Sequence, residues 1–191
     1  MMIEWLLVPG AYLIGSISSA VIVCQLMGLP DPRGQGSGNP GATNVVRIGG
    51  KKAGVITLVG DALKGVIPVL IAQLLNVETL LLACVVFAAF IGHLYPVFFE
   101  FKGGKGVATS LGVALGVDVF LGFSLLATWL LVYKISKISS LSALVASIFA
   151  PIYVWFMVGD GYLVITFTIT TILLLYRHTS NIKKLIKGTE T

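Results

Sequence analysis

The sequence predicts an all-α integral membrane protein with seven transmembrane helices, two of them short and both within residues 107–133. Hydrophobic residues make up 57% of the 191 residues and charged residues only 11%, whereas a soluble domain carries about 25% charged residues. Uncharged runs long enough to cross a hydrocarbon core of about 30 Å alternate with polar loops. Lysines and arginines concentrate in some of those loops, as expected of the cytoplasmic side. The length predicts a single domain, residues 1–191.

The first three spans are defined by their apolar runs. Residues 5–30 carry no formal charge; they predict a retained span, because a cleaved signal peptide has a shorter apolar core and a basic start. The second span, 53–75, contains Asp61 and Lys64. These two residues share one helix face and are expected to form a structural ion pair, although charges within a membrane are often functional. The third span covers residues 79–99.

The segment 107–133 is compatible with two topologies. As one tilted helix, it would put the two glycine-rich loops on one side of the membrane and the basic tail on the other. As two spans that turn near Asp118, it puts all three on one side. The second arrangement places every lysine and arginine except Lys64 on the cytoplasmic side, with the N-terminus outside and the C-terminus cytoplasmic. We therefore expect two spans of about 13 residues each, accommodated by local bilayer thinning.

The last two spans are bounded by charges. They cover residues 137–160 and 161–176, and a basic tail begins at Arg177. The two cysteines, Cys24 and Cys84, lie in apolar runs. They indicate neither a disulfide framework nor a metal site.

The longest polar run, residues 34–47, contains four glycines. Because glycine tolerates positive φ, consecutive backbone N–H groups can turn to one side and form a concavity that binds phosphate. Asn39, followed by proline, is typical of a helix N-cap. It predicts a short helix over residues 40–48 that ends at the next glycine pair, with Thr43 and Arg47 on one face. The same residue types also form ordinary surface loops, so composition alone does not show that this segment binds phosphate.

Two further polar segments share the predicted cytoplasmic side. In the turn 102–106, glycines separate Lys102 and Lys105. Glycines do nothing for membrane anchoring, so we expect both lysines to hold a phosphate group, Lys105 more strongly. His93 lies near the end of its span. Its position is equally compatible with a hydrogen bond between helices and with a place in a binding site. The other segment is 177–181, Arg-His-Thr-Ser-Asn.

Other common site motifs do not fit. Gly36, Gly38 and Gly41 match the spacing of the dinucleotide fingerprint, but membrane helices flank them instead of a strand and a βαβ unit. The sequence has no P-loop and no G-x-S-x-G elbow. No carboxylate stands near His93 or His178 in the sequence to orient a base. The site is thus predicted to be rich in phosphate binders and poor in nucleophiles, which suits an activated substrate such as a mixed anhydride.

Several segments resemble the motifs of the PlsY family of bacterial acyl-phosphate:glycerol-3-phosphate acyltransferases. They are residues 36–47, 92–109 and 178–190, with an Asp-x-x-Lys-Gly pattern at 61–65. One departure is Lys184, where the family favours arginine; lysine keeps the charge but lacks the bidentate contact.

The resemblance implies a reaction and a location. A fatty acyl group passes from acyl phosphate to the sn-1 hydroxyl of glycerol 3-phosphate, giving lysophosphatidic acid and inorganic phosphate in the first step of bacterial phospholipid synthesis. The protein would be a multi-pass enzyme of the bacterial inner membrane, with its active site at the cytoplasmic face. Its partners would be the two substrates and the lipid bilayer, with no cofactor, metal, nucleic acid or obligate protein partner.

The resemblance and the chemistry together predict the roles of site residues. The expected catalytic residues are Ser37, Thr43, Arg47, Lys105, His178 and Asn181. The expected substrate-binding residues are Gly36, Gly38, Asn39, Gly41, Asn44, Lys102, Gly103 and Gly104. Ser37, Arg47 and the backbone of the first loop would hold the acyl phosphate, and Lys105, His178 and Asn181 would hold glycerol 3-phosphate. Thr43 or nearby N–H groups would stabilise the oxyanion, and the acyl chain would lie between the spans.

The proton of the attacking hydroxyl has two candidate acceptors. His178 has an ordinary pKa of about 6.5, and a substrate phosphate has a second pKa of about 6. We favour the phosphate, because no acid stands near His178 to orient it.

Two other functional classes would use similar cationic loops. A transporter of a phosphorylated solute is disfavoured, because only one charge pair falls at mid-membrane depth and no inverted repeat is visible. A non-catalytic lipid-binding protein would not require three separate polar segments.

Overall fold

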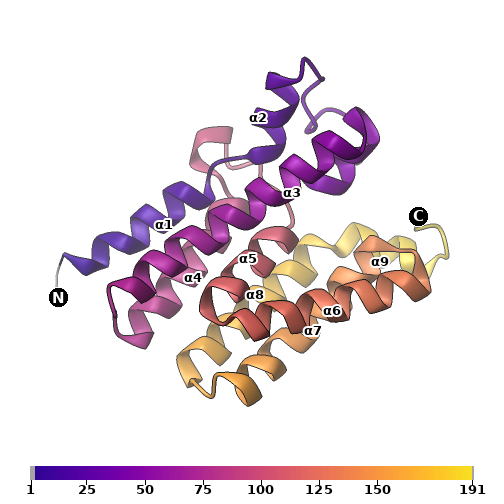
Figure 1. Ribbon diagram of the computed structural model, residues 1–191. Coiled ribbons are helices and arrows are strands. Elements are labelled where there is room, and N and C mark those ends of the chain that lie inside the picture. The colour runs from indigo at the N-terminus through magenta and orange to yellow at the C-terminus, as the bar shows by residue number, and fades with distance from the viewer. Residues whose placement is uncertain (1–2, 191) are drawn as a thin grey trace.

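The computed structural model describes residues 3–190, and this part of the chain is helical, with no strand (Figure 1). The elements are η1 (Glu4–Leu6), α1 (Leu7–Gly15), α2 (Ser19–Leu26), α3 (Ala42–Leu74), α4 (Thr79–Leu94), η2 (Val97–Phe99), α5 (Val107–Val117), α6 (Val119–Ser136), α7 (Ser139–Met157), α8 (Gly161–Arg177) and α9 (Thr179–Ile186). The predicted all-α fold class is confirmed.

Four helical segments are long and apolar enough to cross a membrane. They are α3, the segment Thr79–Phe99 that begins with α4, α6 and α7. Two bent pairs raise the number to as many as six if each pair is one span: Glu4–Gly15 with α2, bent by 42°, and α8 with α9, bent by 62°. The remaining predicted span coincides with α5. It has 11 residues, or about 16 Å at 1.5 Å per residue.

The predicted break within residues 107–133 falls at Asp118. The Asp118 carboxylate accepts a hydrogen bond from the N–H of Leu121 at 2.7 Å, and so caps the first turn of α6. The two halves are not equally short, because α6 continues to Ser136 and has 18 residues. Lys134 lies in its last turn, where the helix dipole favours a positive charge, so this lysine does not end the helix.

α3 is bent at Gly50, whose φ of 77° and ψ of −178° are accessible to glycine and strained for other residues. The bend separates residues 42–49 from the apolar span, as the predicted short helix required. The start of the helix differs from the prediction: Gly41, not Asn39, is the N-cap. The N–H of Gly41 donates to the carbonyl oxygen of Asn39 at 2.9 Å, and this tight turn moves the helix start past Asn39.

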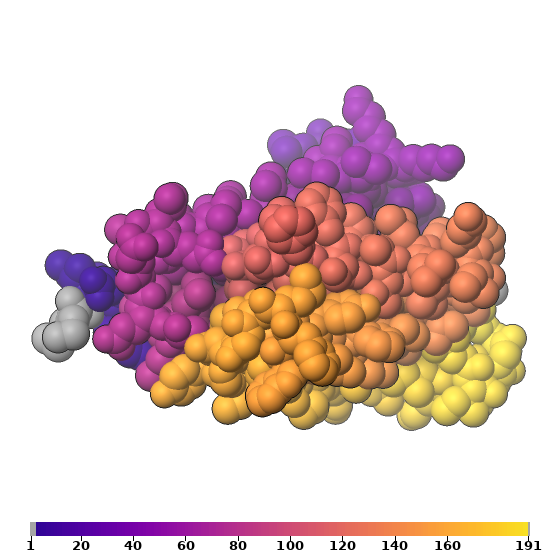
Figure 2. Space-filling model, turned by 60° about the horizontal axis from the view of Figure 1, so that its bottom comes forward, coloured from indigo at the N-terminus to yellow at the C-terminus, as the bar shows by residue number. Residues whose placement is uncertain are grey.

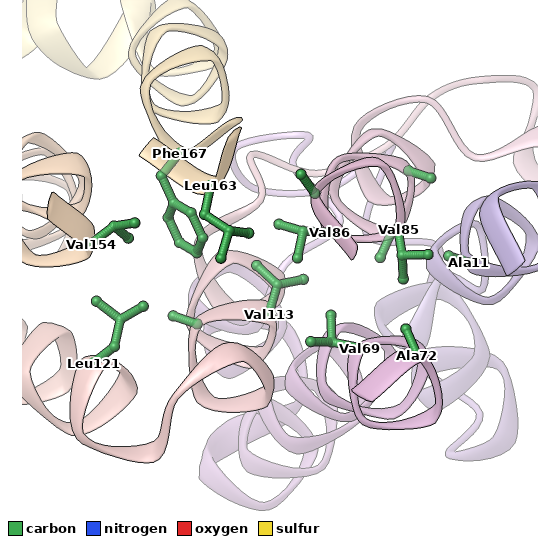
Figure 3. Close-up of a cluster of buried hydrophobic side chains, with 14 of the residues drawn as sticks. Ala11, Val69, Ala72, Val85, Val86, Val113, Leu121, Val154, Leu163 and Phe167 are labelled. Atoms are coloured by element: carbon green, nitrogen blue, oxygen red, sulfur yellow. The ribbon is translucent and has the colours of Figure 1, made fainter. Parts of the chain in front are cut away.

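The main apolar core lies between the helices that surround α5. Figure 3 shows side chains from several helices converging there, among them Val69 of α3, Val85 of α4, Val113 of α5 and Phe167 of α8. Each of these four side chains is at most 1% exposed. The core therefore fixes α3, α4, α5 and α8 relative to one another, and these helices lead into the polar loops.

α3 and α5 approach each other closely because small residues face across their contact. A Cβ added to Gly112 would lie only 2.1 Å from the carbonyl oxygen of Ala62, and one added to Gly65 would lie 2.6 Å from that of Thr109. Such contacts are typical of helix pairs in membranes, where packing rather than water exclusion drives association.

The C-terminal segment lies beside the α6–α7 turn. Figure 2 shows this segment, in yellow, at the same end of the molecule as the turn, in orange. The Ser140 hydroxyl donates to the Glu190 carboxylate at 2.7 Å. Glu190 is thereby brought back to the start of α7.

Candidate active site

A cavity of about 480 Å³ brings the three predicted polar segments together. Much of its polar lining comes from the loop before α3 with the first turns of that helix, from the turn before α5, and from α9 with its flanking residues. Of the predicted site residues, the cavity is lined by Ser37, Asn39, Gly41, Thr43, Asn44, Arg47, Lys105, His178 and Asn181. Further polar lining residues are Asp61, His93, Ser110, Ser139, Ser140, Ser147, Lys184, Thr189 and Glu190.

The first wall is the loop before α3, and Asn44 organises it. Asn44 is 1% exposed; its Oδ1 accepts a hydrogen bond from the N–H of Ser37 at 3.0 Å, and its Nδ2 donates to the carbonyl oxygens of Pro32 at 2.9 Å and Gln35 at 3.0 Å. A Cβ at Gly36, whose φ is +57°, would lie 2.3 Å from Asn44 Oδ1. Asn44 thus holds the loop in shape, while its neighbours face the cavity.

The second wall is the turn that ends at Lys105. Arg177 donates to the carbonyl oxygens of Gly103 at 2.8 Å and Gly104 at 3.2 Å, and its guanidinium lies 5.8 Å from the centre of the Tyr95 ring. These two glycines therefore support Lys105 and are not among the lining residues. Lys102 is also outside the lining: its side chain is 68% exposed, and its ammonium lies 2.7 Å from the Glu100 carboxylate.

The third wall contains His178, which is 3% exposed. Its Nδ1 lies 2.8 Å from the carbonyl oxygen of Leu174. A carbonyl only accepts, so Nδ1 carries the proton in the neutral ring and Nε2 keeps its lone pair. Burial lowers the pKa of His178 to about 4, against the hydrogen bond to Leu174, which raises it. The ring is therefore neutral at pH 7.

Lys105, Asn181 and Glu190 form a hydrogen-bonded chain in the cavity lining. The Lys105 ammonium donates to Asn181 Oδ1, and Asn181 Nδ2 donates to Glu190 Oε1 at 2.5 Å. Burial lowers the pKa of Lys105 below its ordinary value, although Glu190 opposes this. Burial also raises the pKa of Glu190, but hydrogen bonds from Asn181 and Ser140 outweigh it and leave the pKa lowered. Glu190 was not predicted as a site residue, although it is the last residue of the segment 178–190 that resembles a family motif.

The cavity continues into an apolar slot between membrane helices. Its apolar lining includes Leu58, Leu111, Leu125, Leu126, Trp129, Leu130, Ala143, Ala146 and Ala150. The alanines occur at helical spacing on α7, where their small side chains leave room opposite the bulky residues of α6.

The predicted Asp61–Lys64 ion pair is confirmed, with Lys64 Nζ 2.8 Å from Asp61 Oδ1. Lys64 Nζ also donates to the carbonyl oxygen of Ile17 at 2.7 Å, in the break between α1 and α2. His93 joins this cluster, with its Nδ1 3.7 Å from Asp61 Oδ1. The folded chain therefore places a carboxylate beside His93, although none stands near it in the sequence.

Fold and cavity together define an integral membrane protein with a site for an amphiphilic anion, in which polar and cationic groups and an apolar slot line one cavity. Residues 5–188 match the family model described as glycerol-3-phosphate acyltransferase. The chain belongs to the glycerol-3-phosphate acyltransferase family, and it is an acyltransferase.

Similar proteins cover almost the whole chain. A glycerol-3-phosphate acyltransferase of Methylococcus capsulatus is 57% identical over 190 residues, which are 100% of this chain and 96% of that protein. One of Thioalkalivibrio sulfidiphilus is 53% identical, covering 100% of this chain and 94% of that protein.

Two crystal structures of PlsY, an integral membrane glycerol 3-phosphate acyltransferase, share the fold. The glycerol 3-phosphate form has a TM-score of 0.94 and 39% identity, and the lysophosphatidic acid form has a TM-score of 0.90 and 38% identity. Both cover 98% of this chain and 94% of the other. The resemblance to the PlsY family is confirmed.

Proposed function

We propose that this acyltransferase uses a fatty acyl phosphate as donor and esterifies the sn-1 hydroxyl of glycerol 3-phosphate. The observation that carries the proposal is a single cavity with cations on two walls, Arg47 on one and Lys105 on another, above an apolar slot. Two phosphate-bearing substrates, one with an acyl chain, require this combination. The similar crystal structures hold glycerol 3-phosphate and lysophosphatidic acid, which supports the acceptor and the product.

The proposed roles follow the walls of the cavity. Ser37, Arg47 and the backbone around Gly41 hold the phosphate of the donor, and Thr43 or a neighbouring N–H group stabilises the oxyanion. Lys105, with Asn181, holds the phosphate of glycerol 3-phosphate, while the acyl chain occupies the slot between α6 and α7.

The chemical step is a substitution at the acyl carbon. The sn-1 oxygen attacks the carbonyl carbon and forms the ester bond. The bond from that carbon to the bridging phosphate oxygen then breaks, and inorganic phosphate leaves. The hydroxyl proton passes to a substrate phosphate. The low pKa of His178, about 4, supports this route, because a general base works best when its pKa lies near the operating pH. His178 Nε2 is then a hydrogen-bond partner of glycerol 3-phosphate.

The proposed topology has seven spans, with the N-terminus outside and the C-terminus in the cytoplasm, and the whole chain acts as one transmembrane acyltransferase domain. Two observations support it. The start of α1 and the helix α9 lie at opposite ends of the molecule (Figure 1), and the three polar segments share one cavity. The active site then faces the cytoplasmic side of the bacterial inner membrane.

Donor choice tests the proposal directly. Purified enzyme is given palmitoyl phosphate or palmitoyl-CoA, with and without glycerol 3-phosphate, and both phosphate release and the position of the ester are measured. We expect phosphate release only when acyl phosphate and glycerol 3-phosphate are both present, with the acyl group at sn-1. Equal turnover with the CoA thioester, or acylation at sn-2, would refute it. Uptake of glycerol 3-phosphate into proteoliposomes without ester formation would indicate a transporter instead.

A further inference from the structure

The turn that carries Lys105 rests on a buried polar cluster formed by Asp61, Lys64 and His93. These side chains are 2%, 5% and 6% exposed, respectively. The charge of Lys64 is already engaged by Asp61 and by the carbonyl oxygen of Ile17. His93 is the member of the cluster that extends from Asp61 to the turn.

His93 contacts the turn through both its ring and its backbone. A Cβ on Gly104 would lie 2.2 Å from His93 Nε2, and a Cβ on Gly103 would lie 2.1 Å from the carbonyl oxygen of His93. The N–H of Gly104 donates to that same oxygen at 3.2 Å. Neither glycine has a positive φ, so both are required for space and not for backbone conformation.

The turn is therefore held by two partners. Arg177 holds the carbonyl oxygens of Gly103 and Gly104, and His93 packs against the Cα of Gly104. His93 Nδ1 lies 3.7 Å from Asp61 Oδ1, and the carbonyl oxygen of Asp61 accepts a hydrogen bond from the Thr109 hydroxyl at 3.0 Å. Lys105 is the next residue along, so the place from which its side chain extends toward Asn181 depends on this packing.

We propose that His93, packed between Asp61 and Gly104, is a positioning residue that sets the place of the Lys105 ammonium and thereby the affinity for glycerol 3-phosphate. The proposal rests on the proposed function in one respect, namely that Lys105 binds the phosphate of this substrate. It assigns no proton transfer to His93, because Nε2 packs against the backbone of Gly104.

The test measures KM for each substrate separately, together with kcat, in His93→Ala. Displacing a substrate-holding group by about 1 Å costs up to roughly 100-fold. We expect KM for glycerol 3-phosphate to rise roughly 10- to 100-fold, while KM for the acyl donor and kcat each change less than about threefold. His93→Gln, which keeps a polar side chain of similar length, should recover part of the affinity. Lys51→Ala is the matched control, because Lys51 is an exposed cation outside the cavity lining.

A double-mutant comparison tests the contact itself. Gly104→Ala alone should raise KM for glycerol 3-phosphate, since its methyl group would collide with the His93 ring. In a His93→Ala background the ring is gone, and the nearest remaining atom, the carbonyl oxygen of Pro40, lies 3.2 Å from the methyl position, so the substitution should cost much less. The two substitutions should therefore be strongly non-additive, as expected of residues in contact. If Gly104→Ala multiplies KM by the same factor in both backgrounds, the proposal is wrong.

Lys105→Ala separates this inference from the function on which it rests. If Lys105→Ala leaves KM for glycerol 3-phosphate unchanged, the assigned role of Lys105 fails. If Lys105→Ala raises that KM but neither His93→Ala nor Gly104→Ala does, the positioning role alone fails. A fall in kcat with both KM values unchanged would also overturn the proposal. If His93→Ala does not fold, Gly104→Ala and His93→Gln still give the answer.

Discussion

Replacing His178 by glutamine decides which group accepts the proton of the attacking hydroxyl. His178 uses Nδ1 to hold the carbonyl oxygen of Leu174 at 2.8 Å, so only Nε2 can serve the substrate. Glutamine places an amide near that position, where it can form a hydrogen bond but cannot take up a proton. The variant therefore separates binding from base catalysis.

The two routes predict different kinetics for this variant. If a substrate phosphate takes the proton, the variant loses about one neutral hydrogen bond, worth 0.5–1.5 kcal/mol. KM for glycerol 3-phosphate then rises roughly 2- to 13-fold, and kcat changes little. If His178 is the base, kcat falls by roughly 10²–10⁴. Steady-state assays that vary each substrate in turn measure both quantities. Unchanged KM with nearly abolished turnover would refute substrate-assisted transfer.

The pH dependence gives an independent check on the same residue. Burial lowers the pKa of His178 to about 4, so its charge does not change between pH 5 and 8. A titration of activity near pH 6 then belongs to a substrate phosphate, whose second pKa is about 6, and it should persist in His178→Gln. Because the pKa of the folded state lies below the unfolded value, the neutral ring stabilises the fold above about pH 6.5, and this contribution is lost as pH falls toward 4. Loss of the pH 6 titration in the variant would assign it to His178.

Three further measurements test the site, the packing and the topology. Arg47→Ala should lower kcat/KM by roughly 10²–10³, the usual effect of removing one preorganised contact to a reacting anion. Lys51→Ala should stay near wild type. Full activity of a folded Arg47→Ala enzyme would show that Arg47 does not act in the site. Gly112→Leu should lower the melting temperature in detergent by roughly 2–12 °C, because overpacking costs about 1–3 kcal/mol, and an unchanged value would contradict the close α3–α5 contact. Single cysteines at Lys102 and Ser180, which are both exposed, should react with an impermeant reagent from the same side of the membrane, and labelling from opposite sides would disprove the seven-span topology.

Most of the helical framework could be predicted because its signals are local. The break at Asp118 combines a charge with an N-cap side chain, and the bend at Gly50 follows from a glycine pair after a short polar helix. The ion pair between Asp61 and Lys64 follows from their spacing on one helix. Each of these features depends on residues within one or two turns of each other.

The parts that were missed depend on packing between distant residues. No local pattern places Asp61 beside His93, because their separation is set by how α3 packs against α4. Glu190 reaches the cavity only because the chain after α9 turns back to Ser140. Lys102 has the same glycine neighbours as Lys105, yet its side chain lies outside the cavity beside Glu100. The sequence predicted which types of residue form the site. The packing of the helices determines which of those residues reach the cavity.

The distribution of the cavity walls along the chain has a consequence for biosynthesis. One wall comes from the loop before α3, which is made early, whereas Asn181 and Glu190 lie in or after α9, which follows every other helix. Chains are synthesised from the N-terminus, and early parts fold while later parts are still being made. The Lys105–Asn181–Glu190 chain cannot close until translation has passed residue 190. A nascent chain halted after α8 would already hold several membrane helices but would lack this part of the cavity, so we expect it to be inserted and inactive.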